Sequence, residues 1–163
     1  MHVHAYEKLW LGAALLLIVG LVATITYGAA AGVTMVDDSG GTVDPGSLAD
    51  HPDFGDPGVE RVGENHYAVH VVAQQFLFRP DPIVVPANST VTFHVTSADV
   101  VHGFEVVGTN ANTMVIPGQV STITVEVGGP KSYGIVCHEY CGSGHHTMAT
   151  TLEIVPESEF EQR

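Results

Sequence analysis

The sequence predicts an all-β sandwich that follows a single membrane-spanning helix. An uncharged apolar run extends from Leu9 to Val33, and a membrane-spanning helix needs about 20 such residues. From residue 65 onward, short apolar stretches alternate with turn residues at intervals of about eight to twelve positions, which is typical of sandwiches and barrels. The 163-residue chain therefore suits one compact domain with one appended helix.

The apolar run is interpreted as a retained anchor rather than a cleaved signal peptide. Tyr6 and Trp10 lie at its start and Tyr27 near its end, where amphipathic rings favour the interface between lipid and water. Small residues at 29–31 would suit a cleavage site, but the apolar core of a signal peptide has only about 7 to 15 residues. Lys8 alone indicates a cytoplasmic amino terminus, so the flanking charges do not settle the orientation.

A segment rich in Asp, Gly and Pro separates the apolar run from the β pattern. Residues 36–64 contain few large apolar side chains, so we expect an extended, solvated linker there. The expected organisation is an anchor at 1–35, this linker at 36–64, and a β domain at 65–163 that ends in an acidic tail.

The strands are predicted from the alternation of apolar and polar side chains. Residues 91–96 and 122–127 alternate strictly, which gives each strand one face toward a core and one toward water. About seven or eight strands are expected, enough for a sandwich. The other predicted strands are Tyr67–Ala73, Ile83–Val85, Phe104–Val107, Met114–Ile116, Tyr133–Val136 and Thr150–Val155.

Both cysteines of the chain lie at 137–148, in the segment CHEYCGSGHHTM. A disulfide between them would close a very small loop, gain little entropy, and leave the neighbouring His and Met unexplained. Two Cys and two His would satisfy a structural zinc site, but Met is not a usual zinc ligand. Thiolate, imidazole and thioether together form the soft ligand set that suits copper in electron transfer.

The second cysteine indicates more than one copper ion, because a mononuclear blue copper site needs a single thiolate. Cys137 and Cys141 in one tight loop can bridge two copper ions, each of which then needs a terminal imidazole. His145 supplies one imidazole from the loop. His102 is the best candidate for the other, because its loop follows a strand expected to pack near the last hairpin. Met148 would add a weak ligand to one copper ion, and a backbone carbonyl would add a weak ligand to the other.

The remaining histidines carry weaker signals. His70 and His94 fall inside predicted strands, so we expect solvated or packed side chains there. His138 and His146 flank the cysteine segment, and spacing alone does not exclude either from ligation. Asp99 precedes the upstream candidate histidine by three residues and is interpreted either as a hydrogen-bonding partner that orients its loop or as an ordinary turn residue.

These motifs resemble those of a known family. The pattern C-x3-C-x3-H-x2-M at 137–148, after S-x-D-V-x-H-x-F at 97–104, is similar to the dinuclear copper centre, CuA, of cytochrome c oxidase subunit II. The segments at 73–76 and 108–110 also fit that family. A single membrane helix makes the layout most similar to the B-type haem-copper oxidases, and the resemblance covers essentially the whole chain.

The resemblance implies a cupredoxin-like Greek-key barrel on the outer, positive side of the plasma membrane, with the amino terminus inside. It also implies a ligand set, position by position. The bridging thiolates would be Cys137 and Cys141, the terminal imidazoles His102 and His145, the weak axial ligand Met148, and the main-chain carbonyl that of Glu139.

The function implied is that of the subunit through which electrons enter a terminal oxidase. Electrons would come from a cytochrome c or a small blue copper protein and pass to a haem in subunit I, where oxygen reduction is coupled to proton pumping. The chain would thus act as part of an oxidoreductase and hold no oxygen-reducing site itself. Two alternatives stay open: the copper subunit of a nitric oxide reductase, and a membrane-anchored mononuclear copper carrier.

Two further residues are singled out by the resemblance. Phe76 lies in the region where relatives carry an aromatic at the donor surface, although a core position explains it equally well. The carboxylate at the position of Glu139 helps to hold magnesium at the interface with subunit I in many relatives, whereas some B-type relatives have Gln and lack the ion. Magnesium therefore remains an alternative that is not assigned.

The charge of the chain restricts its partners. With 18 acidic and 5 basic residues the formal charge is −13, which argues against nucleic acid as a partner because a polyanion would be repelled. The acidity lies mostly in the linker and the tail. A docking field for a basic electron carrier is one interpretation. General surface acidity that keeps the protein soluble in concentrated salt is favoured, because the charge is spread over segments that look flexible.

Overall fold

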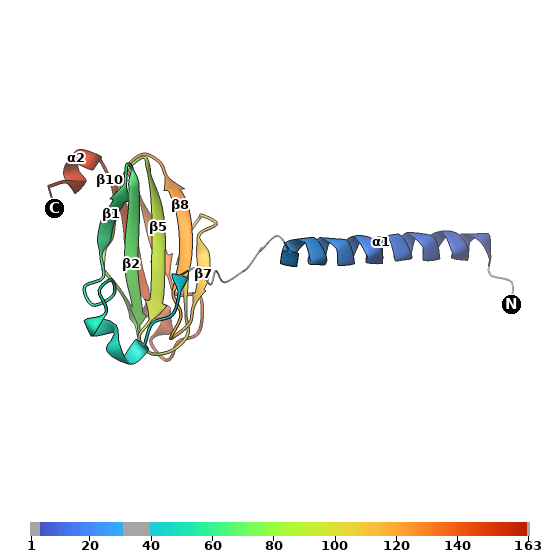
Figure 1. Cartoon of the computed structure of the whole chain (residues 1–163), viewed down its shortest axis with the longest axis horizontal. Coiled ribbons are helices and arrows are strands. Elements are labelled where there is room, and N and C mark those ends of the chain that lie inside the picture. Colours follow the sequence, from blue (N-terminus) through green and yellow to red (C-terminus); the bar gives the residue numbers. More distant parts are fainter. Residues whose placement is uncertain (1–3, 31–39, 163) are drawn as a thin grey trace. The chain divides into compact units, whose positions relative to one another are not determined.

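The computed structural model of the protein describes residues 4–30 and 40–162. The chain divides between residues 35 and 36 into two compact units, an apolar helix and a β sandwich (Figure 1).

Helix α1 spans Ala5–Ala30, and its part Ala5–Gly28 is long and apolar enough to cross a membrane. Its large apolar side chains are exposed, as lipid contact requires. The hydroxyls of Thr24 and Thr26 donate to the carbonyls four residues earlier, so these polar groups are satisfied within the helix. The helix agrees with the expected membrane-spanning run from Leu9 as far as Ala30. Residues 1–3 and 31–35 of the expected anchor lie outside the described part of the chain.

The sandwich consists of two five-stranded sheets (Figure 1). In the first sheet the order is β1-β2-β5-β8, with β3 also paired to β2; in the second it is β4-β10-β9-β6-β7. The strands of the first sheet are β1 (Val59–Gly63), β2 (His66–Gln74), β3 (Leu77–Arg79), β5 (Ser89–Ser97) and β8 (Ser121–Val127). The strands of the second sheet are β4 (Ile83–Pro86), β6 (His102–Val106), β7 (Asn112–Val115), β9 (Lys131–Val136) and β10 (Ala149–Val155).

The core lies between the two sheets, and the expected all-β sandwich is confirmed. Strand β5 shows the reason: Val91, Phe93 and Val95 are fully buried, while the residues between them face outward and are half-buried. The ring of Phe104, from the second sheet, contacts Phe93 at 5.4 Å and Phe78 at 5.7 Å between ring centroids. Strands far apart in sequence are thereby fixed against one another.

Part of the expected linker is folded onto the first sheet, so the expectation of an extended, solvated segment is wrong for residues 40–64. A 3-10 helix, η2 (Pro45–Asp50), and the loop after it bury Leu48 and Phe54. These two side chains pack with Val72 and Val120. Few apolar residues suffice here because the outer face of the sheet supplies their partners. The rest of this stretch includes β1, and residues 36–39 lie outside the described part.

The acidic tail begins with a short helix, α2 (Glu157–Phe160). The Phe160 ring meets the Tyr67 ring edge-on, with 5.5 Å between centroids. This ring contact holds the start of the tail against the sandwich.

Candidate metal centre

The cysteine segment is the connection between the two neighbouring strands β9 and β10. Cys137 directly follows β9 and Met148 directly precedes β10, and the N–H of Cys137 donates to the Met148 carbonyl at 3.1 Å. This bond extends the antiparallel ladder beyond the pair Val136 and Ala149. Strand β6 lies on the other side of β9 and begins at His102. The topology therefore brings the distant His102 to the same end of the sheet as the cysteines.

His102 is fully buried, and Asp99 fixes its orientation. The Oδ1 atom of Asp99 lies 2.8 Å from His102 Nε2 and also accepts the N–H of Val100 at 2.6 Å. The Oδ2 atom of Asp99 accepts the N–H of Gln75 at 2.8 Å. Partial burial alone would raise the pKa of Asp99, but the bonds from Gln75 and His102 outweigh it and lower the pKa. An ionised carboxylate only accepts hydrogen bonds, so the Nε2 atom of His102 carries the proton. The lone pair of Nδ1 is then available for a metal.

The two thiols face one another beside that free nitrogen. The sulfurs of Cys137 and Cys141 are 3.9 Å apart, and both cysteines are free and buried. His102 Nδ1 lies 3.9 Å from the Cys137 sulfur. The donor atoms of these three buried residues all lie within 4.8 Å of one another, a grouping compatible with metal binding.

Each thiol has one imidazole and one weaker donor close by. Near Cys137 these are His102 and the main-chain carbonyl of Glu139, whose oxygen lies 3.2 Å from the sulfur. Near Cys141 they are His145, with Nδ1 at 3.6 Å, and Met148, with its sulfur at 3.6 Å. The six residues expected to ligate copper are thus gathered at one end of the second sheet.

The protonation of the thiols links metal binding to pH. Burial and the hydrogen bond with Cys137 raise the pKa of Cys141 to about 11. A thiolate is the metal-binding form, so the metal must displace a proton from this sulfur at neutral pH. The N–H of Gly103 lies 3.4 Å from the Cys137 sulfur and stabilises negative charge there.

Phe76 and Gln75 support the cysteine segment from the end of β2. Gln75 Nε2 donates to the carbonyl of Cys141. The Phe76 ring packs so closely under the loop that a Cβ at Gly144 would come within 2.5 Å of it. Phe76 is only half-buried, so it contacts both the core and the surface. Sequence reasoning missed the contact of Gln75, because nothing in its local pattern reveals a partner 66 residues away.

The other histidines stand apart from the cluster. His138 is exposed, and its ring lies over Gly103 with Nε2 3.3 Å from the Thr113 carbonyl. His146 is exposed on the 3-10 helix η3 (His145–Thr147). His70 and His94 are half-buried on the outer face of the first sheet, as expected for residues inside strands.

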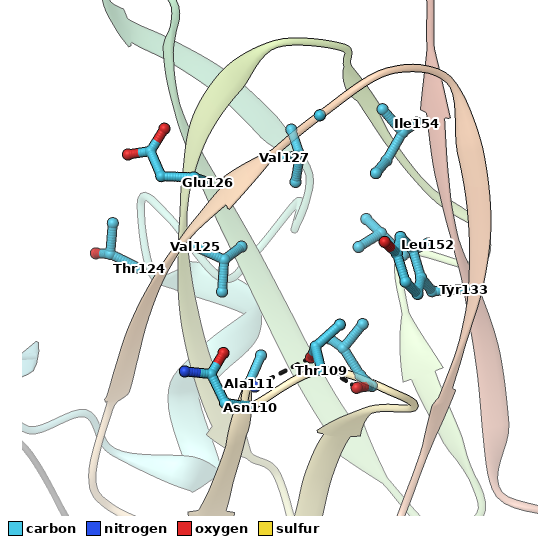
Figure 2. A pocket seen from close by; sticks show the side chains of 12 residues that line it. Thr109, Asn110, Ala111, Thr124, Val125, Glu126, Val127, Tyr133, Leu152 and Ile154 are labelled. Carbon is cyan, nitrogen blue, oxygen red and sulfur yellow. Dashed lines mark hydrogen bonds between the residues drawn. The ribbon is translucent and has the colours of Figure 1, made fainter.

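A pocket of about 350 Å³ lies away from the cluster. Figure 2 shows it near the end of β8, with Val125 and Val127 on one side and Tyr133 of β9 and Leu152 of β10 on the other. No residue of the thiol and imidazole cluster lines it. The cluster and this pocket are therefore separate places in the sandwich.

The class of protein to which the chain belongs is defined first by a solved structure with a similar fold. The structure matches the periplasmic domain of subunit II of cytochrome oxidase from Bradyrhizobium japonicum, with a TM-score of 0.55 and 21% identity over 58% of this chain and 88% of that one. At this identity the match concerns the fold alone. It confirms a cupredoxin-like domain, here joined to an apolar helix long enough to cross a membrane.

The family follows from closer relatives. The profile of the family "Cytochrome C oxidase subunit II, periplasmic domain" matches residues 52–155. Cytochrome c oxidase subunit 2 of Thermus thermophilus is 40% identical over 154 residues, 92% of each chain. A chain of a heme-copper terminal oxidase dimer has a TM-score of 0.65 and 32% identity, over 92% of this chain and 99% of that one. The chain belongs to the cytochrome c oxidase subunit II family.

Family membership confirms the general function expected from the sequence. The chain is a copper-binding subunit of an oxidoreductase complex, and its role is to admit electrons to a haem-copper oxidase.

Asp99 is expected to act as a positioning residue for His102. Replacing Asp99 by Ala removes the acceptor at Nε2, and such changes behind a metal-binding histidine typically weaken metal affinity about 10- to 100-fold. Asp99→Asn keeps an acceptor without charge and should show a smaller loss with a shifted reduction potential. Competition with a copper chelator and redox titration measure both effects.

Glu64→Ala, at an exposed position in the turn before β2, at the end of that strand opposite Gln75 and Phe76, is the control and should match the unmodified chain. If Asp99→Ala retained full copper affinity and an unchanged potential, Asp99 would be an ordinary turn residue.

Proposed function

We propose that the cluster holds a dinuclear copper centre of the CuA type, with Cys137 and Cys141 bridging the two ions. The observation that carries the proposal is the paired arrangement, in which each thiol has its own imidazole and its own weak donor. The terminal ligands are His102 and His145, and the weak ligands are Met148 and the carbonyl of Glu139.

The donor set fits a copper pair better than its rivals. A disulfide requires sulfurs about 2.05 Å apart, whereas these thiols are free and lie 3.9 Å from one another. Sulfurs at that spacing both reach an ion between them with bonds of about 2.3 Å, the usual metal–thiolate length in zinc sites. A four-coordinate zinc ion would leave the buried Met148 sulfur unexplained, and a lone copper would leave one thiol unused.

The residues of the chain fix the ligands and exclude water. Copper shared between two thiolates supplies a one-electron carrier whose bond lengths change little with oxidation state. His102, Cys137, Cys141 and Met148 are buried in the sandwich, which restrains their positions and keeps the surroundings apolar. Asp99 holds one imidazole ring, and Phe76 and Gln75 hold the loop. This rigidity is what low reorganisation during electron transfer requires.

The partners proposed are an electron donor and the haem-bearing subunit I. Exposed apolar side chains lie on the segments that carry the centre: Leu77 beside Phe76, Val100 and Val101 before His102, and Tyr140 between the cysteines. Contact through these side chains depends little on salt, which suits a cytochrome c or small copper protein approaching an apolar patch. The half-exposed ring of Phe76 is the proposed place where the electron enters.

The sandwich is proposed to face the outer, positive side of the plasma membrane, with the amino terminus inside. A magnesium ion is not part of the proposal. The Glu139 side chain joins no group of three candidate metal-binding side chains within the described residues.

Copper content and spin distribution test the proposed function. The full chain in detergent, loaded with copper, should contain two copper ions, and its electron paramagnetic resonance spectrum should show one unpaired electron shared by two copper nuclei. One copper with the hyperfine pattern of a single nucleus would instead support a mononuclear carrier. Identifying the large subunit that co-purifies with the chain separates oxygen reduction from nitric oxide reduction.

A further inference from the structure

A second group of imidazoles lies on the outer face of the first sheet. His70 of β2 and His94 of β5 are directly opposite one another in the parallel register. Their ring centroids are 5.1 Å apart and the ring planes differ by 20°. Their neighbours Val69, Val71 and Val95 point into the core on the other face and are fully buried. This pair therefore belongs to the solvent side of the sheet and takes no part in the copper centre.

The folded segment before β1 covers the pair and forms a pocket of about 270 Å³. His51 and Asp53 line this pocket together with His70 and His94. The Phe54 ring meets the His70 ring edge-on at 5.5 Å and so holds the segment over the sheet. The side chains of His51 and Asp53 are 30% and 50% exposed, which leaves them room to turn toward the pair.

The ring nitrogens of the pair are available for coordination. Neither nitrogen of His70 has a hydrogen-bond partner among the described residues, and His94 has one contact, from Nδ1 to the Thr122 hydroxyl at 3.4 Å. Burial and the neighbouring His70 lower the pKa of His94, more than the Asp53 carboxylate raises it. The imidazole of His94 is therefore neutral at neutral pH, which is the form that binds a metal.

The spacing of the rings suits a shared ion. With metal–nitrogen bonds of about 2.0–2.1 Å, two imidazoles on one tetrahedral ion have ring centroids roughly 5 Å apart. The observed separation of 5.1 Å is close to this spacing. The rings are stacked with planes 20° apart, so each ring turns about its side-chain torsions to aim one nitrogen at the shared ion. Asp53, or His51, completes the set by a rotation of its partly exposed side chain, and water fills the remaining position.

We propose that His70 and His94, with Asp53 and His51 from the covering segment, form a second metal site for a divalent ion of the Zn²⁺ or Cu²⁺ type. Neutral imidazoles with one carboxylate favour these ions over Mg²⁺ and Ca²⁺, which prefer oxygen ligands. The bound ion links the segment at 51–53 to the middle of β2 and β5, and so fastens the covering segment to the sheet.

Equilibrium dialysis of the full chain, with its copper centre already filled, tests the site. In an excess of Mg²⁺, the chain should take up one Zn²⁺ in addition to its copper. His70→Gln and His94→Gln should each weaken zinc binding at least 10-fold, and Asp53→Asn should weaken it less. A parallel titration with Cu²⁺ should give tighter binding at the same residues, following the usual order of affinities.

His66→Gln is the matched control, because His66 lies on the same face of β2 but is bonded to Thr92 at 2.9 Å. It should bind zinc like the unmodified chain. The absorption of the copper centre reports folding of every variant. The proposal is overturned if the unmodified chain binds no zinc, if Mg²⁺ displaces it, or if the folded double variant His70→Gln/His94→Gln binds as tightly. Zinc should also raise the melting temperature of the unmodified chain but not of the double variant.

Discussion

Replacing either Cys137 or Cys141 by Ser is expected to abolish the spectrum of the copper pair. Each sulfur is proposed to bond to both ions, so one substitution removes a bond from each of them. A serine hydroxyl is nearly the same shape but is a harder donor that does not ionise at neutral pH, so it does not replace a bridging thiolate. Copper content should fall from two ions to one or none, as metal analysis and electron paramagnetic resonance will show.

The two serine variants should nevertheless fold, because the sulfurs are buried at the end of the sandwich rather than at its centre and the change conserves volume. Ser143→Ala, at an exposed position in the same loop, is the matched control and should keep both ions. A delocalised spectrum that survived in either cysteine variant would disprove the bridging assignment.

The fold was predictable where the pattern of side chains is local. The uncharged run predicts α1, and the alternation of Val91, Phe93 and Val95 predicts β5, because period-two patterns read directly onto a sheet. The folded part of the linker was not predictable in the same way. Leu48 and Phe54 are isolated among Asp, Gly and Pro, and their burial depends on the outward-facing Val72, which no local pattern connects to them.

The candidate site was likewise predictable only where its residues lie close together in the sequence. Cys137, Cys141, His145 and Met148 share one loop, so their spacing alone indicated a soft metal site. His102 required an argument about topology. The strand before its loop, β5, lies in the first sheet rather than beside the last hairpin, and His102 instead reaches the cysteines by beginning β6, which pairs with β9. The contacts of Gln75 and Phe76 with the loop had no signal, since they arise only where the end of β2 meets the β9–β10 connection.

His102→Ala and His94→Ala are expected to have opposite effects on two different metals. His102 is fully buried and its Nδ1 faces Cys137, so its loss should remove a terminal ligand and release or alter at least one copper ion. Added imidazole should enter the space left by the side chain and restore part of the spectrum, which a purely structural role would not predict. His94 lies on the outer face of the sheet, so His94→Ala should leave the copper spectrum unchanged.

The same two variants separate the copper centre from the proposed outer site. His94→Ala should lose the additional Zn²⁺, because one of two facing imidazoles is removed, whereas His102→Ala should retain it as long as the sandwich stays folded. If His94→Ala disturbed copper instead and His102→Ala did not, the upstream terminal ligand would have to be reassigned to β5. The sheet argues against that outcome, because β5 presents His94 to the side opposite the buried Phe93 and Val95, whereas β6 begins with His102 directly beside the end of β9.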